Sequence, residues 1–120
     1  MARPNILLIH TDQQALWTVG AHGGREVATP HIDRIAGEGV TFAGCHTVCA
    51  VCTPSRGCLL TGLYPHQHGA YTNDVPLRQD VATWAQMLAR GGYRTGYVGK
   101  WHLDGPLRPG FVHPSRGMGF

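Results

Sequence analysis

The residues best suited to chemistry lie in a short segment that runs from Cys52 to Arg56. Pro54 suits the first turn of a helix and Thr53 is a typical cap, so the sequence predicts a helix over residues 54–60. The Cys52 thiol would then lie just ahead of the helix. Free backbone N–H groups and the positive end of the helix dipole favour an anion at that place. The segment therefore predicts a thiol placed where a negatively charged group binds.

Three further polar residues follow predicted strands. Asp12 comes just after an almost continuous apolar run over residues 5–10, and Lys100 and His102 follow a strand expected over residues 93–98. The ends of parallel strands are the usual place for functional groups in an open α/β sheet. Taken alone, the three would be interpreted as a loop carboxylate, an exposed lysine and a hydrogen-bonded histidine. Their positions make them candidates for a site.

Strand and helix patterns alternate along the chain, which is typical of an α/β fold with a mostly parallel sheet. The predicted strands cover residues 5–10, 40–45 and 93–98. The predicted helices cover residues 29–39, 54–60 and 81–90. Thr29 and Asp80 are the expected caps of the first and last helices, by their side-chain type. Residues 63–76 and 105–120 are rich in turn-forming residues and are expected to be irregular.

Composition and charge narrow the class of protein. At 120 residues and 13.0 kDa the chain is at most one domain, and its net charge of +3 comes from scattered basic residues. A nucleic-acid-binding surface favours a basic stripe with interleaved aromatic residues, so no nucleic-acid partner is expected. No secretory leader or apolar run of transmembrane length is visible. We therefore expect no membrane association and a cytoplasmic location.

Four cysteines lie close together in the sequence, at Cys45, Cys49, Cys52 and Cys58. Such a cluster could hold zinc or an iron–sulfur group, but the two well-spaced C-x2-C pairs of a strong metal motif are absent. An intracellular chain of this size does not normally rely on disulfides. We therefore expect Cys45, Cys49 and Cys58 to be small buried hydrophobic residues.

The segment from Cys52 to Arg56, with Thr61 and Gly62 behind it, resembles the core motif of the sulfatase family. The segment from Gly92 to His102 resembles the second shared motif of that family. The resemblance implies an alkaline-phosphatase-like three-layer α/β fold with a mostly parallel sheet. Residues 1–120 would be the incomplete, N-terminal part of a sulfatase catalytic domain.

The same resemblance implies a chemistry. In sulfatases a maturation enzyme oxidises the motif cysteine to formylglycine, and one hydroxyl of the hydrated aldehyde attacks the sulfur of a sulfate ester. Cys52 would be the precursor of that group and also a metal ligand, and Arg56 would hold the hydrate. Lys100 would neutralise a sulfate oxygen, and His102 would hydrogen-bond the hydrate and help remove its proton. Asn73 lies where some relatives place a substrate-contacting asparagine, although a simple turn residue is an equal alternative.

The resemblance also implies a divalent cation. Asp12 and Gln13 lie where many sulfatases have two adjacent aspartates that bind a metal, usually calcium. Gln13 departs from that pattern, and the missing negative charge leaves Mg²⁺ and Mn²⁺ open beside Ca²⁺. The further metal ligands of the family, and its second histidine and lysine, have no match after His102. The isolated 120 residues are therefore expected to have little or no activity.

Alternative functions remain open at this point. Phosphonate monoester and phosphodiester hydrolases share the fold and the Cys-x-Pro-x-Arg element, and Asp12, Gln13 and Asn73 are compatible with them. The chain could also be an inactive, truncated remnant, or a small module in which the cysteines hold zinc. A basic binding module is disfavoured because the chain has no basic cluster.

Overall fold

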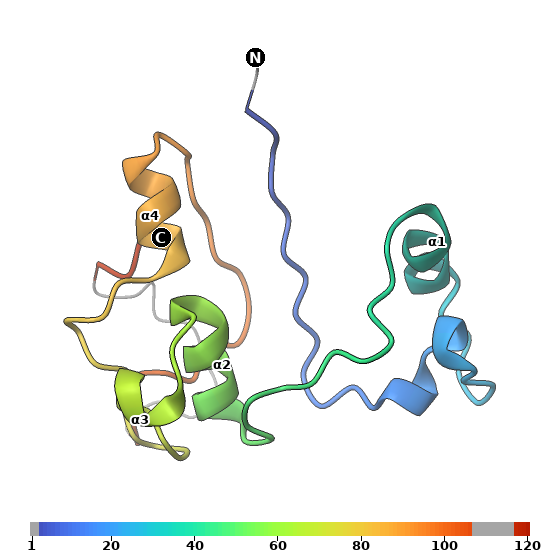
Figure 1. The fold of residues 1–120 in the computed structure, drawn as a ribbon, viewed down its shortest axis with the longest axis horizontal. Coiled ribbons are helices and arrows are strands. Elements are labelled where there is room, and N and C mark those ends of the chain that lie inside the picture. Colours follow the sequence, from blue (N-terminus) through green and yellow to red (C-terminus); the bar gives the residue numbers. More distant parts are fainter. Residues whose placement is uncertain (1–2, 107–116) are drawn as a thin grey trace. The chain divides into compact units, whose positions relative to one another are not determined.

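The computed structural model describes residues 3–106 and 117–120, which fall into two compact units, Met1–Cys45 and His46–Phe120. The first unit contains two short 3-10 helices and one α-helix: η1 (Leu16–Thr18), η2 (Gly20–His22) and α1 (Pro30–Glu38) (Figure 1). The second unit contains α2 (Cys52–Thr61), α3 (Pro65–His68) and α4 (Trp84–Arg90). Across residues 3–106 and 117–120, no helix is both long and apolar enough to cross a membrane.

The first unit is organised around the hydroxyl of Thr29, just ahead of α1. This hydroxyl accepts the N–H of Gly20 at 2.8 Å and donates to the carboxylate of Asp33 at 2.9 Å. Asp33 in turn accepts the N–H of Ala21 at 2.7 Å. The helix expected over residues 29–39 is therefore confirmed, but Thr29 makes no capping bond to the backbone of α1. Its side chain ties η2 to α1 instead.

The second unit has a small apolar core. Its buried members come from α2 and from segments on both sides of α4: Leu60, Ala70, Leu77, Trp101, Leu103 and Met118. Tyr97 packs edge-on against Trp101, with ring centroids 5.2 Å apart. The backbone N–H of Leu77 also donates to the carbonyl of Leu103 at 2.9 Å. These contacts fix the segment that contains Lys100 and His102 beside α2.

The helix predicted over residues 54–60 is present but begins earlier, because α2 starts at Cys52. Cys52 is thus the first residue of the helix and does not lie ahead of it. Val51 occupies the cap position and makes no side-chain capping bond. Thr53 lies inside the first turn, so its assignment as the cap is wrong.

The last helix is shorter than the predicted span of residues 81–90, because α4 begins at Trp84. Thr83 and Gln86 form a capping box: the hydroxyl of Thr83 accepts the N–H of Gln86 at 3.2 Å, and the Gln86 side chain accepts the N–H of Thr83 at 2.9 Å. Asp80 is not the cap. Its carboxylate pairs with the guanidinium of Arg78 on the surface.

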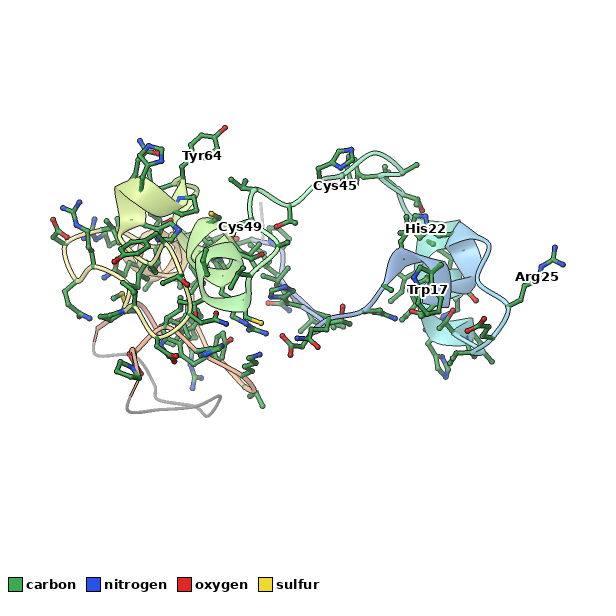
Figure 2. All side chains as sticks on the ribbon, turned by 90° about the horizontal axis from the view of Figure 1, so that it is seen from below. Trp17, His22, Arg25, Cys45, Cys49 and Tyr64 are labelled. Carbon is green, nitrogen blue, oxygen red and sulfur yellow. The ribbon has the colours of Figure 1, made fainter. Side chains whose placement is uncertain are left out.

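The segment over residues 63–76 is not entirely irregular, because it contains the short helix α3. Pro65 begins α3, and Gly69 ends it in a left-handed conformation with φ of 87°. Tyr64, ahead of α3, is exposed and projects outward in Figure 2. Its ring stacks on that of His66 at a centroid distance of 5.9 Å. Most of the tail expected over residues 105–120 lies outside the described residues.

The predicted sheet is not seen within residues 3–106 and 117–120. The strands were expected over residues 5–10, 40–45 and 93–98, yet no residue in the described part of the chain is in a β-strand. Apolar side chains in these segments lie exposed, with Leu7 at 84 %, Val40 at 79 % and Val98 at 99 %. A strand is stable when neighbouring strands accept its backbone hydrogen bonds and one face is covered. Tyr97 does cover part of one face of the segment over residues 93–98, but no described residue forms a neighbouring strand for any of the three segments.

Candidate active site

At the start of α2, Asn73 and the backbone of His102 are both hydrogen-bonded to the neighbour of Cys52. The side-chain oxygen of Asn73 accepts the backbone N–H of Thr53 at 3.1 Å, and the hydroxyl of Thr53 donates to the carbonyl of His102 at 2.8 Å. Thr53 is buried, whereas Cys52 beside it is partly exposed. Three segments that are far apart in the sequence are thus hydrogen-bonded together next to the candidate nucleophile.

Arg56 makes a second connection one turn further along α2. Arg56 is only 6 % exposed, and its guanidinium donates to the carbonyl of Lys100 at 2.7 Å and lies 3.5 Å from the hydroxyl of Tyr97. The Tyr97 hydroxyl donates to the same carbonyl. A guanidinium keeps its positive charge at any pH that a protein meets. Together with the N-terminus of α2, it favours negative charge in this region.

Three residues other than glycine have a left-handed backbone among the described positions: Gln13 with φ of 54°, Asp74 with φ of 64° and His102 with φ of 58°. This conformation is uncommon for residues with a side chain, and it costs on the order of 1–3 kcal/mol. Strain of this kind gathers at functional sites. Gln13 and His102 were themselves predicted as site residues, and Asp74 follows Asn73.

Asp12 and Gln13 lie in the first unit, in an exposed segment ahead of η1. Cys52, the third predicted metal ligand, belongs to the second unit. Carboxylate and amide oxygens are the ligands that Ca²⁺ and Mg²⁺ prefer, but these ions take six or more ligands including water. In residues 3–106 and 117–120, no three His, Cys, Asp or Glu side chains gather in a way that could hold a metal. Asp12 and Gln13 therefore fit part of a metal site.

The expectation that three of the cysteines are buried is wrong. Cys45 is exposed, as Figure 2 shows, and Cys49 and Cys58 are partly buried. All of the cysteines have free thiols. Because a zinc module would bring at least three ligands together, the described residues give that alternative no support.

A buried histidine supports α2 from the side of α3. His68 is fully buried, and its Nδ1 accepts the N–H of Ala70 at 3.2 Å. The neutral ring therefore carries its proton on Nε2. This nitrogen lies 3.5 Å from the sulfur of Cys58. Burial lowers the pKa of His68; burial, followed by the nearby Cys49, raises the pKa of the Cys58 thiol. The ring of His68 therefore packs against α2 at Gly57 and Cys58.

The comparisons with known proteins agree on one family. The sequence model of the family named Sulfatase matches residues 4–117. The chain belongs to the sulfatase family. It is 44 % identical over 105 residues to the uncharacterized sulfatase YidJ of Escherichia coli (strain K12), a match that covers 88 % of this chain and 21 % of that protein.

Two further sulfatase comparisons extend the match. The chain is 41 % identical over 113 residues to the N-acetylglucosamine-6-O-sulfatase of Bacteroides thetaiotaomicron, covering 94 % of this chain and 20 % of that protein. It also resembles a protein solved in complex with its substrate D-glucosamine-2-N,6-O-disulfate, with a TM-score of 0.79 and 39 % identity over 85 % of this chain and 21 % of the other. The chain spans about a fifth of the length of these curated relatives.

Sulfatases have an alkaline-phosphatase-like fold, so the fold family expected from the two motifs is confirmed. The parallel sheet is not seen in the described residues and stays a prediction. Sequence reasoning assigned no role in the site to Tyr97 or to the hydroxyl of Thr53. Both act on backbone carbonyls, of Lys100 and His102. The spacing of the second sulfatase motif, which contains Tyr97, was the one signal that could have drawn attention to it.

Proposed function

We propose that the protein hydrolyses sulfate esters and that residues 1–120 form part of its catalytic domain. The observation that supports this proposal most directly is the junction at the start of α2. There Thr53, the neighbour of Cys52, bonds both Asn73 and His102. Thr53 belongs to the motif that contains Cys52, and His102 belongs to the second motif. Each motif could form its local structure without a hydrogen bond to the other, so their contact is a separate observation in favour of a shared site.

The proposed nucleophile comes from Cys52. When a maturation enzyme has converted Cys52 to formylglycine, the hydrated aldehyde supplies one hydroxyl to attack sulfur and a second whose proton loss expels sulfate. The partly exposed position of Cys52 at the first turn of α2 suits this role, because free N–H groups and the helix dipole stabilise an anion there.

Four residues would support the reaction. Arg56 holds the hydrate of the nucleophile. Lys100 supplies positive charge for a sulfate oxygen, and this charge stabilises the transition state most where water is excluded. His102 hydrogen-bonds the nucleophile and accepts its proton when sulfate leaves. Asn73 contacts the substrate from the loop that also caps α2.

We propose that Asp12, Gln13 and Cys52 contribute to a divalent metal site, with Ca²⁺ as the first metal to test and Mg²⁺ and Mn²⁺ as alternatives. The oxygen donors of Asp12 and Gln13 support this choice. The left-handed backbone of Gln13 is also in keeping with a constrained site, since such strain gathers where function holds it in place.

The experiment compares the rates at which different esters are hydrolysed, and the effects of replacing different cysteines. The full-length enzyme that contains residues 1–120 is produced together with a formylglycine-generating enzyme, and mass spectrometry reports the conversion of the Cys52 thiol to an aldehyde. Hydrolysis is then measured with an aryl sulfate, a sulfated amino sugar and a phenyl phosphonate ester. We expect sulfate esters to be the better substrates, and Cys52→Ala to abolish turnover.

The matched control is Cys45→Ala, because Cys45 is exposed. It should leave turnover unchanged. Preference for the phosphonate ester would favour the alternative hydrolase class, and full activity of the Cys52→Ala protein would overturn the proposed mechanism. An inactive protein with a fully converted Cys52 would favour the idle remnant.

A further inference from the structure

We propose that Thr53 is a positioning residue, whose hydroxyl holds the backbone of His102 at a fixed place beside the start of α2. This inference rests on the proposed function. Thr53 is 1 % exposed and donates its hydroxyl proton to the carbonyl oxygen of His102 at 2.8 Å. The two residues are 49 positions apart, so this bond is a tertiary connection between the two sulfatase motifs.

The backbone of His102 needs such support. Its φ of 58° lies in the left-handed region, which a residue with a side chain adopts only when its surroundings impose it. Trp101 and Leu103, on either side, are each 2 % exposed and belong to the core. They anchor the chain before and after His102, while Thr53 binds the carbonyl of His102 itself.

The imidazole of His102 also depends on its backbone. Its Nδ1 is buried, and no group within residues 3–106 or 117–120 hydrogen-bonds this nitrogen. In many catalytic histidines a carboxylate or carbonyl at this nitrogen fixes the orientation of the ring. Here the described residues supply no such partner, so the ring is placed through the backbone that Thr53 holds.

The backbone of Thr53 has a second partner that makes it a rigid reference point. Its N–H donates to the side chain of Asn73 at 3.1 Å, and its position in the first turn of α2 places it directly after Cys52. Thr53 is therefore fixed to the nucleophile by the chain, to His102 by its hydroxyl and to Asn73 by its N–H. A residue in this position can set the distance between nucleophile and histidine without touching the substrate.

The test separates the hydroxyl from the volume of the side chain. Thr53→Ser keeps the hydroxyl, and Thr53→Val keeps the shape without it. We expect Thr53→Val to lower kcat by roughly a hundredfold, the size of effect that a small misplacement of a catalytic group produces, with KM unchanged. Thr53→Ser should retain most of the activity. Each rate is divided by the fraction of Cys52 converted, so that impaired maturation is not mistaken for impaired catalysis.

Thr83 offers a matched structural control. It is fully buried, and its hydroxyl donates to a backbone carbonyl, that of Met118, outside the site. Thr83→Val should lower stability and leave kcat per folded molecule unchanged. If Thr53→Val does not fold, Thr53→Ala is measured in the same way. A normal kcat in either folded variant would overturn the proposal.

A second measurement does not depend on activity. The imidazole signals of His102 are assigned in a protein with ¹⁵N-labelled histidine by comparison with His102→Gln. We expect Thr53→Val to shift these signals, and Thr53→Ser and Thr83→Val to leave them in place. If the wild-type protein hydrolyses no sulfate ester, the proposed function fails while the signals still test the positioning role. Unchanged His102 signals in Thr53→Val would refute that role by themselves.

Discussion

The side-chain oxygen of Asn73 lies 3.1 Å from the backbone nitrogen of Thr53 and accepts its N–H, across a separation of 20 residues. Val51, the residue at the cap position of α2, has no side-chain acceptor of its own. The first N–H groups of a helix need such acceptors. Asn73 therefore supplies from a distant loop the bond that a local capping residue would normally make.

From this hydrogen bond we expect one variant of Asn73 to lose stability, and another to keep its stability but lose activity. Asn73→Ala should lower the free energy of unfolding by about 0.5–2 kcal/mol, the usual effect of losing a helix cap. Asn73→Asp keeps the acceptor, and its charge suits the helix N-terminus, so stability should be retained. The same charge repels an anionic substrate, so kcat/KM should fall. Urea unfolding and steady-state kinetics measure the two effects.

Thr72→Ala is the control for Asn73, because Thr72 is an exposed neighbour in the same loop. It should change neither quantity. If Asn73→Asp were as active as the wild type, Asn73 would not lie near bound sulfate. If Asn73→Ala were as stable as the wild type, the capping role would be wrong.

Two glycines inside helices should respond in opposite ways to alanine. A Cβ at Gly57 in α2 would lie 2.5 Å from the ring of His68, so Gly57→Ala should destabilise the protein by about 1–3 kcal/mol through overpacking. A Cβ at Gly37 in α1 meets nothing within 4 Å, so Gly37→Ala should stabilise it by about 0.5–1 kcal/mol through helix propensity. Urea denaturation of both variants checks the contrast, and equal shifts would contradict the packing of His68 on α2.

His68 should make stability depend on pH. Burial lowers its pKa in the folded protein, so the unfolded chain binds a proton first as the pH falls. The stability contributed by the neutral ring is therefore complete above the unfolded pKa of about 6.5, and it is lost as the pH falls from there toward the lower folded value. Urea midpoints between about pH 7.5 and pH 5 should show this loss.

The variant for this prediction is His68→Gln, which should be less stable at neutral pH but should show a weaker dependence on pH. His31→Gln, at an exposed position of α1, is the control and should keep the slope of the wild type. The same slope in His68→Gln as in the wild type would show that another group titrates.

Arg56 should not tolerate lysine. Its buried guanidinium donates to the carbonyl of Lys100 and lies beside the Tyr97 hydroxyl, and an ammonium cannot reproduce the planar fork of donors. Arg56→Lys should cost about 1.5–3 kcal/mol of stability, the usual value of a hydrogen bond to a charged group. Arg90→Lys, on the exposed end of α4, should cost almost nothing. Thermal and urea unfolding distinguish these outcomes.

The sequence predicted a helix well where the residues that begin and end it are neighbours in the chain. α1 begins at Pro30 and is followed by Gly39, which agrees with the span expected over residues 29–39. The capping box of Thr83 and Gln86 was also present in the sequence and would have placed the start of α4 correctly. The start of α2 could not be read locally, because its cap is Asn73. The predicted strands stay unconfirmed for a related reason: a strand depends on partners that its own residues do not provide.

Motif spacing identified Cys52, Arg56, Lys100 and His102 as candidates, because few chemistries need these residue types in this pattern. The roles themselves remain predictions. Spacing could not reveal that Thr53 bonds His102, since this contact joins a side chain to a backbone carbonyl and almost any residue could supply the carbonyl. Nor could it reveal the left-handed backbone of His102, which the surrounding structure imposes.

If Cys52 is converted to formylglycine as proposed, the burial of the residues around it implies an order of events during biosynthesis. Thr53, Pro54 and Arg56 are all buried once α2 has packed. An enzyme that recognises Pro54 and Arg56 in order to oxidise Cys52 could not contact these buried side chains in the folded molecule. It would have to act on the nascent or unfolded chain, so the time between synthesis and packing of α2 would limit how much of the protein acquires its nucleophile.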